Sequence, residues 1–123
     1  MIGAGINKAE VEYAVTLAVL SFQTEFMRSN YSHIQVNVHE TLIEVIQTRS
    51  ASIPAEEELA KSPEGRTLLR QFHQAIFDSC RDLLREKVEQ AIGGQVEDII
   101  SDFNLTSGKT TLIIRRKHPT EVF

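Results

Sequence analysis

The sequence contains very little cysteine: Cys80 is the single thiol among 123 residues. One cysteine cannot close a disulfide within the chain, so a disulfide-stapled scaffold is excluded and a reducing compartment is the simpler environment. Cys80 also falls on the apolar face of a predicted helix, with no recognisable base or Gly-rich elbow beside it. We therefore expect a buried thiol with no catalytic role.

Glycine and proline are scarce as well, with six and three residues, so a disordered or fibrous chain is a poor fit. Long apolar runs are missing: the segment Val11–Phe22 contains Glu12 and is only about half of the roughly 20 residues that a membrane span needs. The N-terminus has no basic stretch followed by an apolar one, so no signal peptide is expected. These absences predict a soluble, cytoplasmic protein without direct membrane insertion.

Basic residues are outnumbered, with 13 Lys and Arg against 17 Asp and Glu and a formal net charge of -4. Nucleic-acid binding rests on neutralising phosphates, so the balance argues against a general nucleic-acid binder. A chain of this length matches one domain and can bury its own core. We predict a single domain over residues 1–123, with residues 1–6 and 119–123 as loose tails.

Hydrophobic periodicity predicts a helix followed by two strands in the first half of the chain. Asn7 and Glu10 have the spacing of a capping box, and apolar residues then recur at helical spacing from about Lys8 to Arg28. The period changes to two over His33–Val38, which is typical of a strand, and Thr41–Thr48 reads as a second one. The short joint between these strands allows a hairpin.

The stretch from residue 52 to residue 66 contains two helix starts, each with a hydroxyl residue, a proline and then acidic side chains. They predict a short helix over Pro54–Lys61 and a long one over Pro63–Ile92, which Gly93 can end in a left-handed conformation. A second hairpin follows over Val96–Phe103 and Thr110–Arg116. The fold class is therefore α+β: an antiparallel four-stranded sheet from two hairpins, with a long N-terminal helix and a long central helix packed on one face.

The long helix carries a broad apolar face for nearly its whole length, about 40 Å at 1.5 Å per residue. That is more than a four-stranded sheet can cover, so part of the face is expected to meet another chain. We predict a homodimer, and the candidate dimer face consists of Leu69, Phe72, Ile76 and Leu83.

The spacing of the candidate ligands argues against a metal site within the chain. His33 and His39 lie about 20 Å apart along one predicted strand, and His73 and Cys80 lie about 10 Å apart along one helix, so neither pair can share an ion. No Gly-rich phosphate loop is present either. We predict no metal, no cofactor and no catalytic residues.

Spacing also argues against a catalytic pair of carboxylates, because Asp98 and Asp102 lie about 13 Å apart on one predicted strand, too far for an acid/base pair. An enzyme remains an alternative only if the polar side chains of the first strand line a pocket together with a second subunit. Those side chains are His33, Gln35, Asn37 and His39.

Two basic sets are candidates for contacts with an anion or a partner. Arg115, Arg116 and Lys117 finish the last strand with few acids beside them; the alternative is that they protect an edge strand from pairing. Arg66 and Arg70 lie one turn apart on the long helix, where ion pairs with neighbouring acids are the alternative.

Several segments together resemble the MpsC-like family of small bacterial and cyanobacterial proteins, from about Ser32 to Lys117. The segments that carry the resemblance are Pro54-Ala-Glu56, Leu59-Ala-Lys61, Pro63-Glu-Gly-Arg66-Thr-Leu-Leu69, Val96 to Ser101-Asp102, and Gly108. The family takes its name from the C component of a Na+-translocating, membrane-potential-generating system whose integral-membrane partner transports the ion. The resemblance implies an accessory protein and brings no catalytic or binding residues with it.

Two functions from different classes follow. The favoured one is a non-catalytic accessory or regulatory protein that acts through protein association, with a membrane ion-transport complex as a possible partner. The alternative is a dimeric sensor of a small ligand, an anion or metabolite held near Arg115 and Arg116 or at the helix start of Ser62, Pro63 and Glu64.

Overall fold

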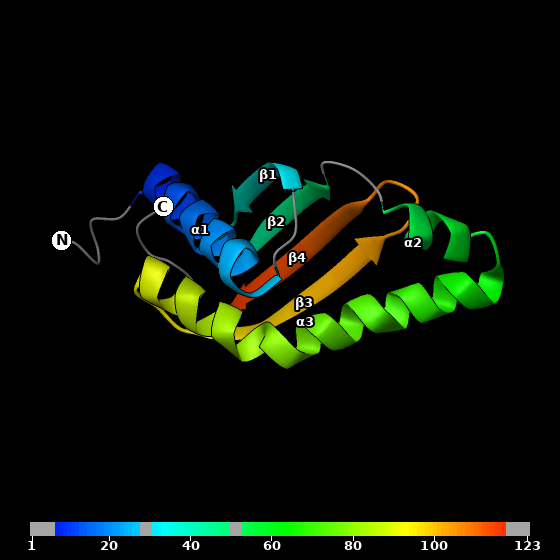
Figure 1. Ribbon diagram of the computed structural model, residues 1–123. Helices are drawn as coiled ribbons and strands as arrows, with labels where there is room; N and C mark the ends of the chain where they lie inside the picture. Colours follow the sequence, from blue (N-terminus) through cyan, green and yellow to red (C-terminus); the bar gives the residue numbers. More distant parts are fainter. Residues whose placement is uncertain (1–6, 28–30, 50–52, 118–123) are drawn as a thin grey trace.

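The computed structural model of the chain describes residues 7–27, 31–49 and 53–117. Two long helices cover one face of a four-stranded antiparallel sheet (Figure 1), so the predicted α+β class and element order are confirmed. The expected tails, residues 1–6 and 119–123, lie outside the described residues. The elements are α1 Lys8–Phe22, the π-helical turn η2 Gln23–Met27, β1 Tyr31–Val38, β2 Leu42–Arg49, α2 Pro54–Leu59, α3 Pro63–Ile92, β3 Val96–Asn104 and β4 Lys109–Arg116.

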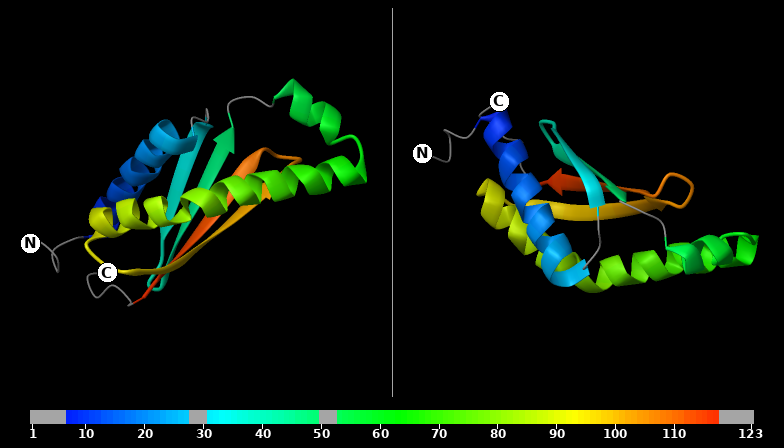
Figure 2. Two further views of the ribbon diagram at one scale, coloured as in Figure 1. Left: turned by 60° about the horizontal axis from the view of Figure 1, so that its bottom comes forward. Right: turned by 45° about the horizontal axis from the view of Figure 1, so that its top comes forward.

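The sheet has the strand order β1-β2-β4-β3, so each hairpin contributes one central and one edge strand. Its register places Val45 of β2 opposite Leu112 of β4, and Ile114 of β4 opposite Ile99 of β3. These side chains point toward the helices, since alternate residues share a face. In the described residues no element covers the opposite face of the sheet (Figure 2). That face carries polar side chains among half-buried and exposed isoleucines.

Two of the three predicted helix starts are capped as the sequence indicates and the predicted stop forms, whereas α2 begins after Ile53 without a side-chain cap. The Asn7 side chain accepts a hydrogen bond from the Glu10 backbone N–H at 2.8 Å, and the Glu10 carboxylate accepts one from the Asn7 N–H at 3.4 Å. Ser62 caps α3 by accepting from the Gly65 N–H at 3.0 Å, and Gly93 ends that helix with φ of 68°. Helix α1 is shorter than the predicted Lys8–Arg28, because the backbone changes to a π-helical turn after Phe22.

The core is aliphatic where α1, the C-terminal half of α3 and the sheet meet. Its apolar side chains that are at most 1% exposed are Val11, Val15, Val19, Phe22, Ile43, Val45, Leu84, Val88 and Ile114. Close packing of such side chains supplies most of the stability of a small domain. Cys80 lies at the edge of this core and is half-buried instead of fully buried as expected.

Helix α3 is much longer than the strands it packs on. Its 30 residues span about 45 Å, whereas an eight-residue strand such as β4 spans about 27 Å. The N-terminal end of α3 therefore extends beyond the sheet, and α2 folds back beside it (Figure 2). The junction is tight: a Cβ on Gly65 would overlap the backbone carbonyl of Leu59.

Candidate functional site

Four side chains from four elements meet at the end of the sheet that lies beside α2. They are Arg49 at the end of β2, Glu56 on α2, His73 on α3 and Phe103 near the end of β3. We call this group the Phe103 cluster. Residues this far apart in sequence come together because α2 folds back over the ends of the two strands.

An ion pair ties α2 to the sheet within the Phe103 cluster. Arg49 Nη1 donates to Glu56 Oε1 at 2.8 Å and Nη2 donates to Oε2 at 3.4 Å, a two-point contact in which both side chains are largely buried. Burial raises the pKa of Glu56. The hydrogen bond and charge of Arg49, together with His73, lower it by more, so the pKa of Glu56 lies below the ordinary value. The pair is thus ionised and internally neutral.

His73 and Phe103 form the aromatic part of the cluster. Their ring centroids lie 4.1 Å apart, and the Arg49 guanidinium carbon lies 5.1 Å from the Phe103 centroid. His73 Nε2 is 3.5 Å from Glu56 Oε1. Burial and the nearby Arg49 charge lower the pKa of His73 despite the opposing effect of Glu56, so its imidazole is neutral near pH 7.

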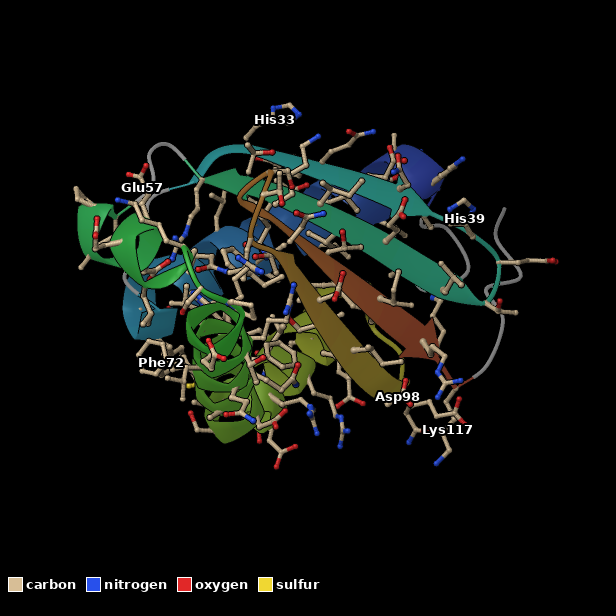
Figure 3. The ribbon with its side chains drawn as sticks, turned by 90° about the vertical axis from the view of Figure 1, so that its right-hand side faces the viewer. His33, His39, Glu57, Phe72, Asp98 and Lys117 are labelled. Atoms are coloured by element: carbon tan, nitrogen blue, oxygen red, sulfur yellow. The ribbon has the colours of Figure 1, made fainter. Side chains whose placement is uncertain are left out.

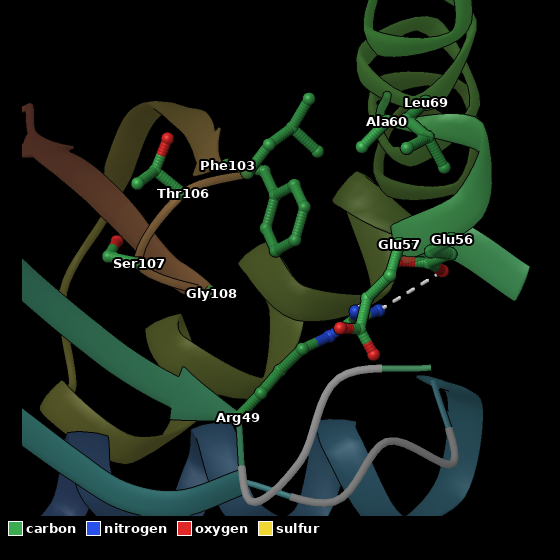
Figure 4. Close-up of a pocket in the computed structure, with 10 residues that line it drawn as sticks. Arg49, Glu56, Glu57, Ala60, Leu69, Phe103, Thr106, Ser107 and Gly108 are labelled. Atoms are coloured by element: carbon green, nitrogen blue, oxygen red, sulfur yellow. Dashed lines mark hydrogen bonds and ion pairs between the residues drawn. The ribbon is translucent and has the colours of Figure 1, made fainter. Parts of the chain in front are cut away.

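Two open cavities adjoin the ring of Phe103. The larger, about 430 Å³, lies between α2 and the loop that joins β3 to β4 (Figure 4). The other, about 310 Å³, lies against α3 and also contacts His73 and Phe103. Both are within the size range of small-molecule sites. The larger cavity is lined by Arg49, Glu56, Glu57, Ala60, Leu69, Phe103, Leu105, Thr106, Ser107 and Gly108.

A third, much smaller cavity of about 40 Å³ lies deeper, between the cluster and the core. Two glutamines line it, Gln23 of η2 and Gln47 of β2, and they are only 6% and 1% exposed. Gln23 Nε2 donates to Gln47 Oε1 at 2.6 Å. The remaining amide atoms, Gln23 Oε1 and Gln47 Nε2, are buried and have no hydrogen-bond partner among the described residues.

The basic residues singled out in the sequence are not gathered into one site. Arg115 forms an ion pair with Asp98 on the open face of the sheet, with Nε donating to Oδ1 at 2.7 Å, and this hydrogen bond lowers the pKa of Asp98. Arg116 is buried, which lowers its pKa, whereas Lys117 is exposed next to it. Figure 3 shows Asp98 and Lys117 together, away from Glu57 at the α2 end.

Arg66 and Arg70 lie near the start of α3, at the α2 end. Arg66 Nη1 donates to the Ala60 carbonyl at 2.9 Å and so caps the end of α2. Arg70 is exposed and lines the 310 Å³ cavity. The two basic sets therefore lie at opposite ends of the molecule, and their contact with an anion or partner stays a prediction.

The four residues of the candidate dimer face differ in exposure. Leu69 is 4% exposed and packs inside the chain at the larger cavity, so it cannot form part of an outer face. Phe72 and Leu83 are exposed and Ile76 is half-buried. The helix therefore presents a narrower apolar row than the sequence predicts, because α2 covers the side on which Leu69 lies.

The histidines of the first strand do not converge. His33 and His39 lie at opposite ends of β1 (Figure 3), and Gln35 and Asn37 lie between them on the open face of the sheet. Within the described ranges, no group of three His, Cys, Asp or Glu side chains is placed to hold a metal ion.

Sequence reasoning missed the Phe103 cluster and the glutamine pair. A weak signal existed for Gln47, which continues the inward alternation of Ile43 and Val45 and so is a polar residue at a core position. No pattern in the sequence linked Arg49 with Glu56 or His73 with Phe103, because the first contact depends on how α2 folds back and the second on how α3 packs against β3.

A family model described as "Na+-translocating membrane potential-generating system (MpsC)" matches residues 7–117. The match includes α1, which precedes the region that carries the resemblance in the sequence. No curated protein and no solved structure matches the chain. In the part of the chain that the structure describes, none of the helices is both long and apolar enough to cross a membrane.

Proposed function

The chain belongs to the MpsC family, and we propose that it is a non-catalytic accessory subunit that regulates a Na+-translocating membrane system by binding to it as a homodimer. The family description names the membrane system. The observation that carries the proposal is a row of apolar side chains on the outer side of α3, which begins in the part of that helix that extends past the sheet.

The row consists of Leu68, Phe72, Ile76 and Leu83, which share one side of the helix because they recur three to four residues apart or at multiples of that spacing. Leu68 and Phe72 are 56% and 57% exposed and Leu83 is 39% exposed. Single exposed apolar side chains are ordinary, but a row of them on one helix is typical of an interface.

A second copy of the chain is the occupant that the side-chain sizes favour. In an antiparallel pair of α3 helices with the twofold axis between Ala75 and Ile76, Phe72 of each copy lies opposite the small Ser79 of the other, and Leu68 lies opposite Leu83. Large side chains facing small ones allow close helix packing.

The charges beside the row do not oppose this approach. Arg81 and Arg85 are each paired with an acid of the same helix, Asp78 and Asp82. Each pair lowers the net charge that one copy presents to the other.

The dimer is tested by sedimentation equilibrium of the purified chain and two variants. We expect the wild type to be dimeric and Phe72→Glu to be monomeric, because the substitution places a charge in the centre of the interface. Leu20→Glu is the matched control, since Leu20 is exposed on α1, outside the α3 row; it should remain dimeric. A monomeric wild type would contradict the dimer.

The regulatory role is tested with everted membrane vesicles from a strain that lacks the chain but keeps the Na+-translocating system. Purified wild type, added back, should change the Na+-dependent membrane potential measured with a voltage-sensitive dye. Phe72→Glu should restore much less of this effect and Leu20→Glu should restore all of it. An identical potential with and without the wild-type chain would exclude the accessory function.

A further inference from the structure

We propose that the deep cavity between the glutamine pair and Phe103 binds the amide edge of a small, uncharged, flat molecule, a carboxamide or a ring lactam. The site is separate from the α3 row on which the accessory function depends. Three features carry the inference: the glutamine pair, the connected space and the local charge.

The glutamine pair presents one donor and one acceptor that the protein leaves unused. One hydrogen bond joins Gln23 to Gln47, and the other polar atom of each amide is buried with no partner in the part of the chain that the structure describes. If both amides are turned over, the result is the same, because one NH₂ group and one carbonyl oxygen still remain. Leaving such groups unpaired in a buried place is costly, so a partner with one acceptor and one donor is favoured.

A carboxamide or lactam has that combination on a single edge, with C=O beside N–H. Its C=O can accept from Gln47 Nε2 while its N–H donates to Gln23 Oε1. A carboxylate offers acceptors alone and would leave the Gln23 oxygen unpaired. The pair therefore selects for an amide over an acid of the same shape.

The space around the pair is suited to a flat group. The deep cavity, at about 40 Å³, is larger than the about 10–15 Å³ that one water molecule requires. Aromatic rings from three elements line it: Phe22, Phe77 and Phe103. Phe103 also lines both outer cavities, so its ring forms the wall between the deep cavity and the 430 Å³ one. A ligand can place its amide edge in the inner space and its remaining atoms in the outer space once this ring turns.

The local charge favours an uncharged ligand. Arg49 and Glu56 neutralise one another, and Glu57 adds an exposed carboxylate beside them. His73, which lines the deep cavity, is held neutral by burial. A phosphate or carboxylate would therefore meet no free positive charge on the inner wall, whereas a flat neutral ring can stack on Phe103 and His73.

The binding test uses the full chain labelled with ¹⁵N, nicotinamide as the carboxamide and uracil as the lactam. We expect at least one of them to shift the side-chain amide signals of Gln23 and Gln47 in a saturable way, while the exposed Gln35 amide stays unchanged. Benzoate, a flat acid, should bind at least tenfold more weakly than nicotinamide. Which probe binds distinguishes a carboxamide from a lactam.

A double variant, Gln23→Met with Gln47→Met, keeps the side-chain length and removes the amides. It should weaken binding of the active probe by at least tenfold, whereas Gln35→Met should not change it. The proposal is overturned if neither probe shifts the two amide signals, if benzoate binds as well as nicotinamide, or if the folded double variant binds like the wild type. These outcomes leave the accessory function untouched, because they concern a different surface.

Discussion

The two ends of the helix and sheet layers differ in what they bury. At the end where α1 meets the C-terminal half of α3, the interior is apolar and consists mostly of valine, leucine and isoleucine. At the end beside α2, the interior holds an ion pair, a histidine and two glutamines, with cavities around Phe103. The first end is thus an ordinary apolar core, whereas the second contains polar groups whose burial costs free energy.

This contrast indicates that the two ends contribute to different properties, one to stability and the other to ligand binding. An aliphatic core needs no partner molecule to be satisfied, whereas buried polar atoms without partners reduce stability unless something binds to them. The aliphatic end is therefore expected to set the free energy of unfolding, and the α2 end is expected to respond to ligands and to pH. Four substitutions test this division, in order of decreasing effect.

The largest loss is expected at the aliphatic end. Leu84 is fully buried, so Leu84→Ala should lower the free energy of unfolding by about 2–5 kcal/mol through lost burial and an unfilled cavity. Leu105, half-buried at the rim of the larger cavity, is the matched control, and its change to alanine should cost less than about 1 kcal/mol. Urea unfolding measures both. Equal losses would remove the contrast between the two ends.

A smaller loss is expected at the junction of α2 and α3. Gly65→Ala places a methyl group against the Leu59 carbonyl, and the shift needed to relieve the overlap should cost about 1–3 kcal/mol. The displaced α2 would also lengthen the contact between Arg49 and Glu56. Gly94→Ala is the control, because its added Cβ meets nothing closer than 3.9 Å. Denaturation with urea should show a loss in the first variant and none in the second.

The glutamine pair should respond in opposite ways to single and double substitution. Gln47→Met leaves Gln23 buried without any partner and should cost about 1–3 kcal/mol, whereas changing both glutamines to methionine should cost little or nothing. Thermal unfolding of the two single variants and the double variant measures the coupling. Additive losses would show that the pair does not act as a unit.

The weakest effect is a pH dependence from His73. Its folded pKa lies below the ordinary 6.5, so the unfolded chain binds more protons and stability falls as the pH drops below about 6.5. The depressed pKa of Glu56 adds a loss at lower pH, below its ordinary 4.5. His73→Gln should flatten the decrease between about pH 7.5 and about pH 5, while the exposed His33→Gln should not. An unchanged slope in His73→Gln would remove His73 from this role.

The elements of the fold could be predicted because their signals are local. The capping box at Asn7 and Glu10, the proline after Ser62 and the glycine after Ile92 each act within one helical turn. Likewise, strand alternation is set by neighbouring residues. These features needed no knowledge of tertiary contacts.

The α2 end could not be predicted because its chemistry depends on distant contacts. Leu69 has the spacing of an exposed apolar residue, yet it is buried against α2, and this requires the turn angle before Pro63. Similarly, His73 is a helix residue with no sequence neighbour that explains its environment. Its partners Glu56 and Phe103 lie on other elements.

The pairing of β2 with β4 has a consequence for synthesis. As the polypeptide leaves the ribosome, the hairpin of β1 and β2 emerges with the β2 backbone open on one side, because β4, its neighbour in the sheet, is made later than β1, β2 and β3. The sheet is therefore completed only after β4 has been made, through contacts between residues that are distant in the sequence, and such non-local pairing is slow to form.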